Sequence, residues 1–242
     1  MTGLSERVIK IFIDFDGTIT KQDIGEEFFL HFGNRETAEK IIKEWEEGII
    51  NSRIVWERLF DSLPEISIEQ AINYINTFSM DDYFSDFLDF CKENNFELMV
   101  LSDGFDLYID RVLEKAGTTN LPRRTNKIIT KNGRLSPVFP HTDEECIDCA
   151  NCKRNHILEN SADTDYTIYI GDGYSDTCPA QYCDFIFAKS SLLKYCEKNR
   201  ISYYPFNNLK DVIERIKELN SRKRLKKRHQ ADLKRKETYK RG

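Results

Sequence analysis

The most constraining feature of this 242-residue chain is a short apolar run, residues 8–13, that ends in Asp14-Phe15-Asp16. A run of this length bounded by polar residues predicts a buried strand. In open α/β folds the carboxyl ends of parallel strands meet at one edge of the sheet, where ligands bind. Two carboxylates at positions i and i+2 of that edge therefore predict a site that holds a cation and carries out acid–base or nucleophilic chemistry.

A second apolar segment, residues 166–170, leads into Gly171-Asp172-Gly173, and Asp176 follows four positions after Asp172. Glycine permits a tight turn at the end of the strand, so Asp172 is expected at the same sheet edge as Asp14. The segment predicts further carboxylates for a divalent cation.

A third apolar segment, residues 96–101, is followed by Ser102, Asp103 and Gly104. A hydroxyl and backbone amides at the start of a following helix suit phosphate oxygens. Lys153 begins another predicted helix and supplies a cation. Because a phosphate dianion is repelled by carboxylates, a metal and a lysine beside them favour phosphoryl transfer.

In this order the segments resemble the haloacid dehalogenase-like superfamily of phosphohydrolases, over roughly residues 8–190. The resemblance implies a Mg²⁺-dependent phosphomonoesterase that passes through an aspartyl phosphate. An acid two residues after the nucleophile goes with phosphatases in this superfamily and disfavours dehalogenation. The implied roles are nucleophile for Asp14, acid/base for Asp16, phosphate binding for Thr18, Ser102, Asp103, Gly104 and Lys153, and metal binding for Asp14, Asp16, Asp172 and Asp176. Thr18 would act by orienting Asp16.

Alternating strand and helix signals predict an α/β fold, a parallel sheet with helices on both faces. Strands are expected near 8–14, 96–101, 166–171, 184–188 and 201–206. Four helices, near 23–32, 35–47, 51–62 and 67–78, are too many for a simple crossover and predict an inserted helical bundle. The predicted division is a catalytic core of residues 1–20 and 82–210, a helical cap of residues 21–81, and a C-terminal helix and basic tail of residues 211–242.

The position of the insertion resembles the cap of the phosphoserine phosphatase-like branch, which closes over the substrate. In that branch a carboxylate that meets the substrate ammonium aligns with Asp23. The Cys146-x-x-Cys149-x-x-Cys152-Lys153 pattern looks instead like the family of 2-hydroxy-3-keto-5-methylthiopentenyl-1-phosphate phosphatases of methionine salvage. The expected substrate is thus a small phosphorylated metabolite, either that enol phosphate or phosphoserine or another metabolite.

The cysteine triplet has two interpretations. Three thiolates at this spacing, with a further histidine or cysteine, could hold zinc. Buried thiols that pack around the lysine are the favoured alternative, since no second Cys-x-x-Cys pair is present. Seven cysteines, an odd number, and no apolar stretch of membrane-spanning length predict reduced thiols and a cytoplasmic protein without a membrane span.

The last feature is a change of charge. Residues 221–242 carry eleven lysines and arginines against two acids, whereas residues 1–220 carry a net charge of −14. With few apolar side chains, this tail is expected to be a frayed helix or disordered and unable to dock by burial. It is a candidate contact for an anionic partner, and a nucleic-acid-binding protein is the non-enzymatic alternative; a solvated extension is favoured. A receiver-type phosphoacceptor fits poorly, because it needs no helical insertion. The chain is expected to be a monomer or homodimer.

Overall fold

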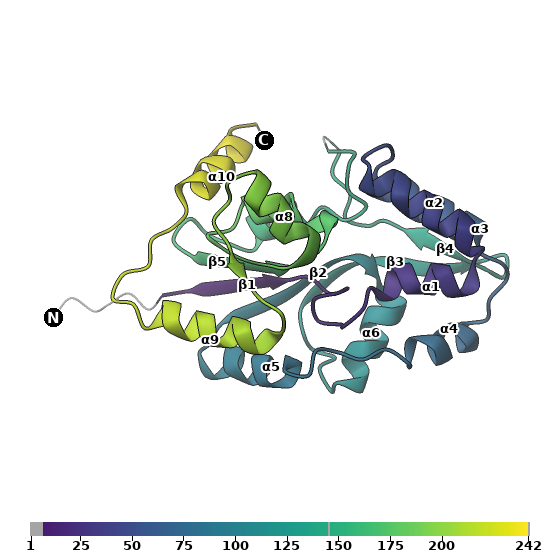
Figure 1. Cartoon of the computed structure of the whole chain (residues 1–242), viewed down its shortest axis with the longest axis horizontal. Coiled ribbons are helices and arrows are strands. Elements are labelled where there is room, and N and C mark those ends of the chain that lie inside the picture. Colours follow the sequence, from purple (N-terminus) through teal and green to yellow (C-terminus); the bar gives the residue numbers. More distant parts are fainter. Residues whose placement is uncertain (1–6, 145, 242) are drawn as a thin grey trace. The chain divides into compact units, whose positions relative to one another are not determined.

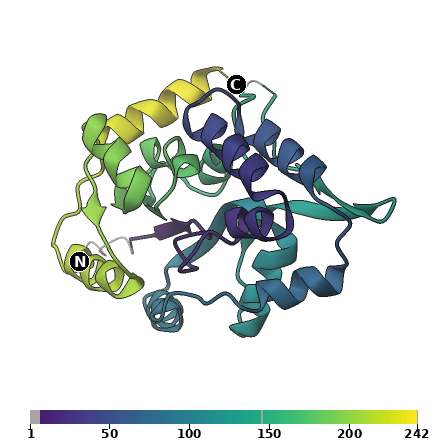
Figure 2. The same cartoon turned by 45° about the vertical axis from the view of Figure 1, so that its right-hand side comes forward.

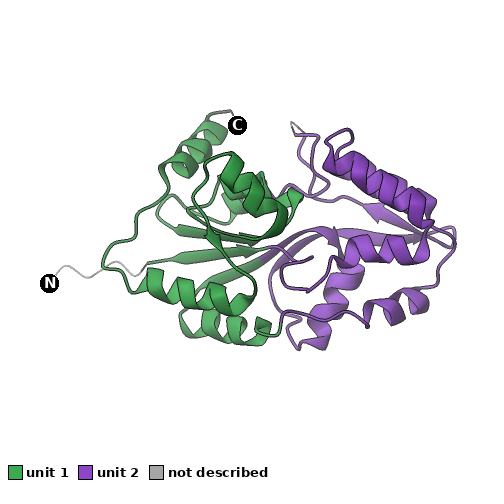
Figure 3. Cartoon of the chain, in the orientation of Figure 1, with its two compact units in different colours: residues 1–13, 82–99, 154–242 green, residues 14–81, 100–153 purple. Residues whose placement is uncertain are grey.

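The computed structural model describes residues 7–144 and 146–241. These residues form two compact units (Figure 3), one made of residues 7–13, 82–99 and 154–241 and the other of residues 14–81, 100–144 and 146–153. The chain passes between the units four times: after Ile13, in the loop between residues 81 and 82, within β2 (Glu97–Phe105), whose first three residues belong to unit 1, and after Lys153.

Unit 1 is built on parallel strands in which β1 (Ile9–Ile13) pairs with β5 (Tyr166–Gly171). Strand β6 (Phe185–Ala188) pairs with β5, and the short β7 (Tyr204–Pro205) pairs with β6. Strands β1 and β5 are almost entirely apolar and buried, as expected for parallel strands covered on both faces. The helices of this unit are α5 (Phe84–Glu93), α7 (Lys153–Glu159, whose first residue belongs to unit 2), α8 (Ser190–Lys198), α9 (Leu209–Asn220) and α10 (His229–Arg241).

The helices of unit 1 cover both faces of its strands (Figure 1). Helices α5 and α9 lie together on one face, and α8 lies on the other. Two 3₁₀ turns, η1 (Tyr174–Asp176) and η2 (Pro179–Gln181), connect β5 to β6. The layered α/β arrangement predicted from the alternating segments is confirmed.

Unit 2 contains the rest of β2, helix α6 (Asp106–Lys115), and strands β3 (Arg123–Lys131) and β4 (Arg134–Val138). Strand β3 pairs parallel with β2 and antiparallel with β4. The seven strands follow the order β4-β3-β2-β1-β5-β6-β7, so the sheet is mostly parallel with one antiparallel edge strand. The β3–β4 hairpin was not predicted, although Asn132 and Gly133, with φ of 51° and 78°, form the turn typical of such hairpins.

The four predicted helices between β1 and α5 are all present in unit 2: α1 (Ile24–Phe32), α2 (Arg35–Glu46), α3 (Ser52–Ser62) and α4 (Ile68–Ile75). Ser67 and Gln70 form a capping box at the start of α4, in which each side chain accepts a hydrogen bond from the backbone N–H of the other residue. Phe29 of α1 and Phe60 of α3 meet edge to face at 4.9 Å in the helical core. Helix α3 also contacts β4 and α4 contacts α6, so the helices share a core with the strands of their own unit.

The prediction that the tail is frayed or disordered and cannot dock by burial is wrong. Helix α10, yellow in Figures 1 and 2, contacts η2 of the same unit, and Leu225, Ala231 and Arg235 are buried. Burial involves a guanidinium as well as apolar carbon: the side chain of Arg235 forms an ion pair with Asp184 at 3.2 Å. The low apolar content of the segment therefore did not reveal that it packs against the rest of unit 1.

Within the described residues, no helix has the length and apolar character needed to cross a membrane.

Candidate active site

The side chains of Asp14 and Lys153 meet inside unit 2. Asp14 comes directly after β1 and is 5% exposed, and Lys153, the first residue of α7, is 2% exposed. The Nζ atom of Lys153 donates to Oδ1 of Asp14 at 2.6 Å. Removing one partner of such a buried pair leaves the other charge uncompensated. The two residues, 139 positions apart, thus form a charged pair at the predicted sheet edge.

The carboxylate of Asp16 lies in the same unit and is held from two sides. Its Oδ1 accepts from the backbone N–H of Ile24 at 3.0 Å, and its Oδ2 accepts from the hydroxyl of Tyr108 at 2.7 Å. Burial, together with the negative charge of Asp23, raises the pKa of Asp16 to about 8. Burial also raises the pKa of Tyr108 well above its usual value, so this phenol stays a neutral donor. A carboxyl that holds a proton near neutral pH suits a general acid.

Ser102 and Gly104 lie at the end of β2, next to Asp16. The hydroxyl of Ser102 lies 3.5 Å from Oδ2 of Asp16 and accepts from the backbone N–H of Gly104 at 2.9 Å. A Cβ at position 104 would lie 2.8 Å from Oδ2 of Asp16 and 2.6 Å from Cζ of Tyr108. Glycine is therefore required here, because any side chain would displace the phenol from Asp16.

The carboxylate of Asp103 has different surroundings from its neighbours. It accepts from the hydroxyl of Ser52, from Nε1 of Trp56 at 3.2 Å and from the backbone N–H of Asn151 at 2.9 Å. Asp103 was predicted with the phosphate ligands, and in the structure its carboxylate accepts these three hydrogen bonds from within unit 2. Burial raises the pKa of Asp103.

The loop after β5, in unit 1, is organised by Asp176. Its Oδ1 accepts from the hydroxyl of Tyr169 at 2.5 Å. Its Oδ2 accepts from the backbone N–H groups of Asp172 and Gly173 at 2.9 and 3.0 Å. Asp176 is fully buried, whereas Asp172 is only half-buried. The buried carboxylate thus fixes the turn that carries Asp172.

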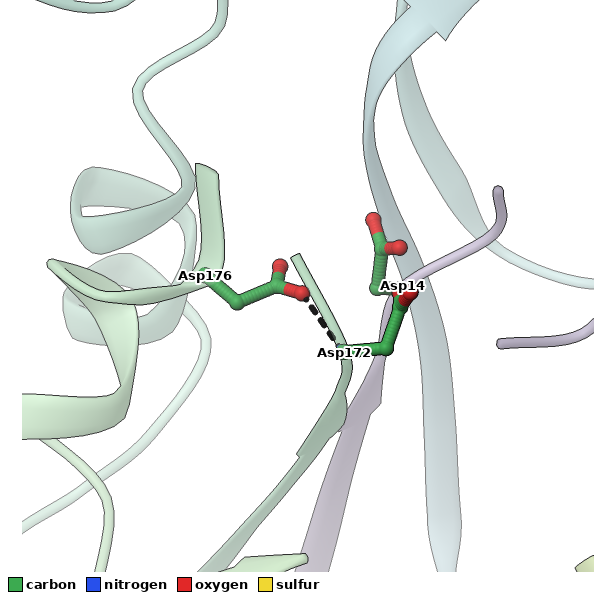
Figure 4. A group of neighbouring side chains, drawn as sticks. All are labelled: Asp14, Asp172 and Asp176. Carbon is green, nitrogen blue, oxygen red and sulfur yellow. Dashed lines mark hydrogen bonds between the residues drawn. The ribbon is translucent and has the colours of Figure 1, made fainter. Parts of the chain in front are cut away.

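Three of the predicted metal-binding acids come together (Figure 4). One carboxylate oxygen from each of Asp14, Asp172 and Asp176 lies within 4.8 Å of the others. Among the described residues, these three side chains form the group that lies close enough together to hold a metal ion. Asp16 is not a member of this group. Carboxylate oxygens are the ligands that Mg²⁺ prefers, so the donor set fits this ion.

Two further predicted site residues, Asp23 and Thr18, differ in their exposure to solvent. Asp23 caps helix α1, where its Oδ1 accepts from the backbone N–H of Glu26 at 2.7 Å, and it is exposed. Thr18 is fully buried in the turn that follows Asp16. Asp23 is therefore exposed, whereas Thr18 is enclosed by the protein.

The cysteine triplet precedes Lys153 in the loop that ends unit 2. Cys152 is buried, and its backbone N–H donates to the carbonyl of His141 at 2.8 Å. Cys146 and Cys149 are half-buried, and the described residues hold no metal-like cluster that includes a thiol.

Four residues of the site were not predicted from the sequence: Ser52, Trp56, Tyr108 and Asn151. Ser52 and Trp56 come from the helical insertion, and no local pattern links them to Asp103. Tyr108 carries a weak signal, since it lies four residues after Gly104, in the first turn of α6. Such contacts depend on the tertiary fold.

Comparisons with known proteins agree with this geometry. Residues 9–205 match the model of a family described as Putative Phosphatase. A 2-hydroxy-3-keto-5-methylthiopentenyl-1-phosphate phosphatase of Bacillus cereus is 31% identical over 221 residues, covering 86% of this chain and 96% of its own length. The enzyme of the same name from Bacillus thuringiensis is 30% identical over 223 residues, covering 87% and 97%.

Solved structures of phosphoserine phosphatase share the fold. A substrate-bound complex has a TM-score of 0.69 at 22% identity and covers 87% of this chain and 99% of its own. A phospho-aspartyl intermediate analogue has a TM-score of 0.67 at 21% identity and covers 86% and 99%. The chain therefore belongs to the Putative Phosphatase family and is a phosphoric monoester hydrolase.

Proposed function

We propose that this phosphatase hydrolyses a small phosphomonoester with Mg²⁺, and that Asp14 is the nucleophile and Asp16 the acid/base. The observation that carries the proposal is the placement of two carboxylates with different partners. Asp14 faces the ammonium group of Lys153 at 2.6 Å, and Asp16 faces the hydroxyl of Tyr108 at 2.7 Å. Environments that differ in this way suit different roles for the two acids.

In the first step an oxygen of Asp14 attacks phosphorus, and the bond from phosphorus to the ester oxygen breaks. Asp16 gives its proton to the departing oxygen, which leaves as an alcohol or enol. Lys153 and the hydroxyl of Ser102 would contact the phosphoryl oxygens as negative charge shifts towards the leaving group. The product on the enzyme is an acyl phosphate of Asp14.

In the second step water attacks phosphorus and Asp16 takes a proton from it. The bond from phosphorus to Asp14 breaks, which restores the carboxylate and releases inorganic phosphate. The donors on Asp16, the hydroxyl of Tyr108 and the backbone N–H of Ile24, hold its carboxylate in one orientation through both steps. One residue can therefore serve as acid and then as base.

Asp14, Asp172 and Asp176 would hold Mg²⁺, which, when bound, offsets the charge of the phosphate and polarises its oxygens. Asp172 is half-buried, whereas Asp176 is fully buried, and its oxygens already accept hydrogen bonds from Tyr169 of β5 and from the loop backbone. Asp172 is thus proposed as a direct ligand and Asp176 mainly as the support of that ligand.

For the substrate we propose the enol phosphate named for the Bacillus relatives. The non-phosphate part would meet helices α1 and α3, which act as the cap. A Cβ on Gly25 would lie 3.0 Å from Cη2 of Trp56, 3.1 Å from the hydroxyl of Tyr108 and 3.3 Å from Oδ1 of Asp23. These three groups pack tightly against Gly25, next to Asp16, and would form the wall that meets the carbon chain of the substrate.

The test is phosphate release from a panel that contains the methionine-salvage enol phosphate, phosphoserine and pyridoxal phosphate, with Mg²⁺ and with EDTA. We expect the enol phosphate to give the highest kcat/KM, hydrolysis to need Mg²⁺, and Asp14→Asn to lose at least about 1000-fold in kcat. Asp89→Asn, which changes an exposed acid on α5, is the matched control. Wild-type rates in Asp14→Asn would refute the nucleophile, and a higher kcat/KM on phosphoserine would refute the substrate.

A further inference from the structure

The side chain of Asp103 joins three segments of unit 2 that are distant in sequence. Its Oδ2 accepts from the hydroxyl of Ser52 and from Nε1 of Trp56, both on α3. Its Oδ1 accepts from the backbone N–H of Asn151, in the loop before Lys153. Asp103 itself is only 8% exposed, so water contributes little to its solvation. These donors are therefore what stabilises its charge.

The loop that Asp103 holds is the one that delivers Lys153. Asn151 lies two residues before Lys153, and its side chain donates to the carbonyl of Ser102 at 2.7 Å. The backbone N–H of Ser52 donates to the carbonyl of Asp148 at 3.1 Å, and the N–H of Ala150 lies 3.4 Å from the Ser52 hydroxyl. The start of α3, the end of β2 and the 148–151 loop thus form one hydrogen-bonded junction.

The same junction fixes the indole of Trp56. The ring packs edge to face on Phe105, with 5.1 Å between the ring centroids, and its Cη2 lies close to Gly25. Its N–H donates to Asp103. An indole held by packing on its ring and by a bond at its nitrogen has one orientation. Asp103 therefore orients Trp56, which is proposed to contact the carbon chain of the substrate, and also holds the loop before Lys153.

We propose that Asp103 is a positioning residue: its carboxylate couples the docking of α3, through Ser52 and Trp56, to the placement of Ser102 and Lys153, through Asn151. This inference rests on the proposed function, because Ser102 and Lys153 are phosphate contacts only there. It assigns Asp103 a role other than binding phosphate, which its negative charge would oppose. Loss of the junction weakens the phosphate site even though no phosphate contact has been removed.

The experiment compares Asp103→Asn, Ser52→Ala and the double variant. The amide keeps the shape of the side chain but cannot accept from all three donors. We expect Asp103→Asn to lower kcat/KM by about 10-fold to 100-fold, the range for a lost hydrogen bond to a charged group. Ser52→Ala should lower it less, and the double variant should be no worse than Asp103→Asn alone, because both changes break one junction. Asp110→Asn, an exposed acid that pairs with Arg123 at 2.5 Å, is the control.

Two measurements do not depend on turnover. The chain has two tryptophans, so Trp45→Phe leaves Trp56 as the only indole. In that background Asp103→Asn should shift the emission maximum of Trp56 and increase its quenching by iodide. Calorimetric titration with inorganic phosphate in the presence of Mg²⁺ should show at least about tenfold weaker binding in Asp103→Asn and no change in Asp110→Asn.

Wild-type phosphate affinity in a folded Asp103→Asn variant, or effects of Ser52→Ala and Asp103→Asn that multiply in kcat/KM, would overturn the inference. If Asp103→Asn does not fold, Ser52→Ala and Trp56→Phe keep the carboxylate and test the same junction; unchanged phosphate affinity in both would overturn it. A wild-type chain that hydrolyses no phosphomonoester would refute the proposed function instead, while the emission of Trp56 would still test its contact with Asp103.

Discussion

Arg235, in the basic C-terminal helix, forms a buried ion pair with Asp184, which lies one residue before β6. Nη2 of Arg235 lies 3.2 Å from Oδ1 of Asp184, and the two side chains are 5% and 0% exposed. Nη1 of Arg235 also donates to the carbonyl of Tyr182 at 2.7 Å, and Oδ2 of Asp184 accepts from the backbone N–H of Thr167 at 3.1 Å. A tail residue is therefore part of the core of unit 1.

The first prediction concerns stability. Arg235→Ala should lower the free energy of unfolding by about 3–5 kcal/mol, because it leaves the carboxylate of Asp184 buried without its cation. Urea denaturation followed by circular dichroism measures the loss. Lys236→Ala is the control, since Lys236 pairs with Asp232 at 2.7 Å on the surface and should contribute less than about 1 kcal/mol. Equal losses in the two variants would contradict the buried pair.

The second prediction concerns Tyr108, whose hydroxyl donates to Asp16 at 2.7 Å. Tyr108→Phe should lower kcat by about tenfold, because Asp16 loses a donor that orients it. The KM for a small phosphomonoester should change less, since the phosphate contacts remain. Tyr74→Phe removes a hydroxyl that donates to the carbonyl of Glu27 at 3.3 Å, and it should leave kcat unchanged. Steady-state kinetics decides, and wild-type kcat in Tyr108→Phe would exclude this role.

The third prediction concerns the space at Gly104. A methyl group there would collide with Tyr108 and Asp16, so Gly104→Ala should lower kcat/KM by more than Tyr108→Phe does, about 100-fold. Gly48→Ala separates collision from backbone strain, because Gly48 has φ of +72° and open space around it. That control should lose about 1 kcal/mol of stability and no activity. Full activity in Gly104→Ala would mean that the loop can shift.

The fourth prediction concerns the acid cluster. Saturating Mg²⁺ should raise the melting temperature of the wild type by about 2–5 °C relative to EDTA, because an ion bound to the folded state stabilises it by mass action. Asp172→Asn should abolish the shift without lowering the melting temperature in EDTA, since Asp172 is only half-buried. Asp89→Asn should keep the full shift. Differential scanning fluorimetry suffices, and an unchanged shift in Asp172→Asn would exclude it as a ligand.

The strand ends were predictable because apolar runs and the acids behind them are local patterns. Strand β1 with Asp14 and strand β5 with Asp172 appear where expected, and helix α1 starts within one residue of its predicted start. The roles assigned to the individual site residues stay predictions. The β3–β4 hairpin was missed because most side chains of β3 are polar and only one of its residues is buried, so β3 lacks an apolar run.

Contacts between distant segments could not be predicted in the same way. The bonds from Ser52 and Trp56 to Asp103 span 51 and 47 positions, and no periodicity encodes them. The tail was misjudged for a related reason. Arg235 reads as a surface charge in sequence, and its partner Asp184 lies 51 positions away. One buried partner is enough to change a solvated arginine into a core residue.

The way Asp176 holds the loop after β5 has a kinetic consequence. Its oxygens already accept from the backbone N–H groups of Asp172 and Gly173 and from the phenol of Tyr169. The loop is therefore ordered when the protein folds and needs no rearrangement each time an ion arrives. After the metal has been removed by a chelator, the rate at which Mg²⁺ binds again should therefore be limited by how fast the ion loses its bound water.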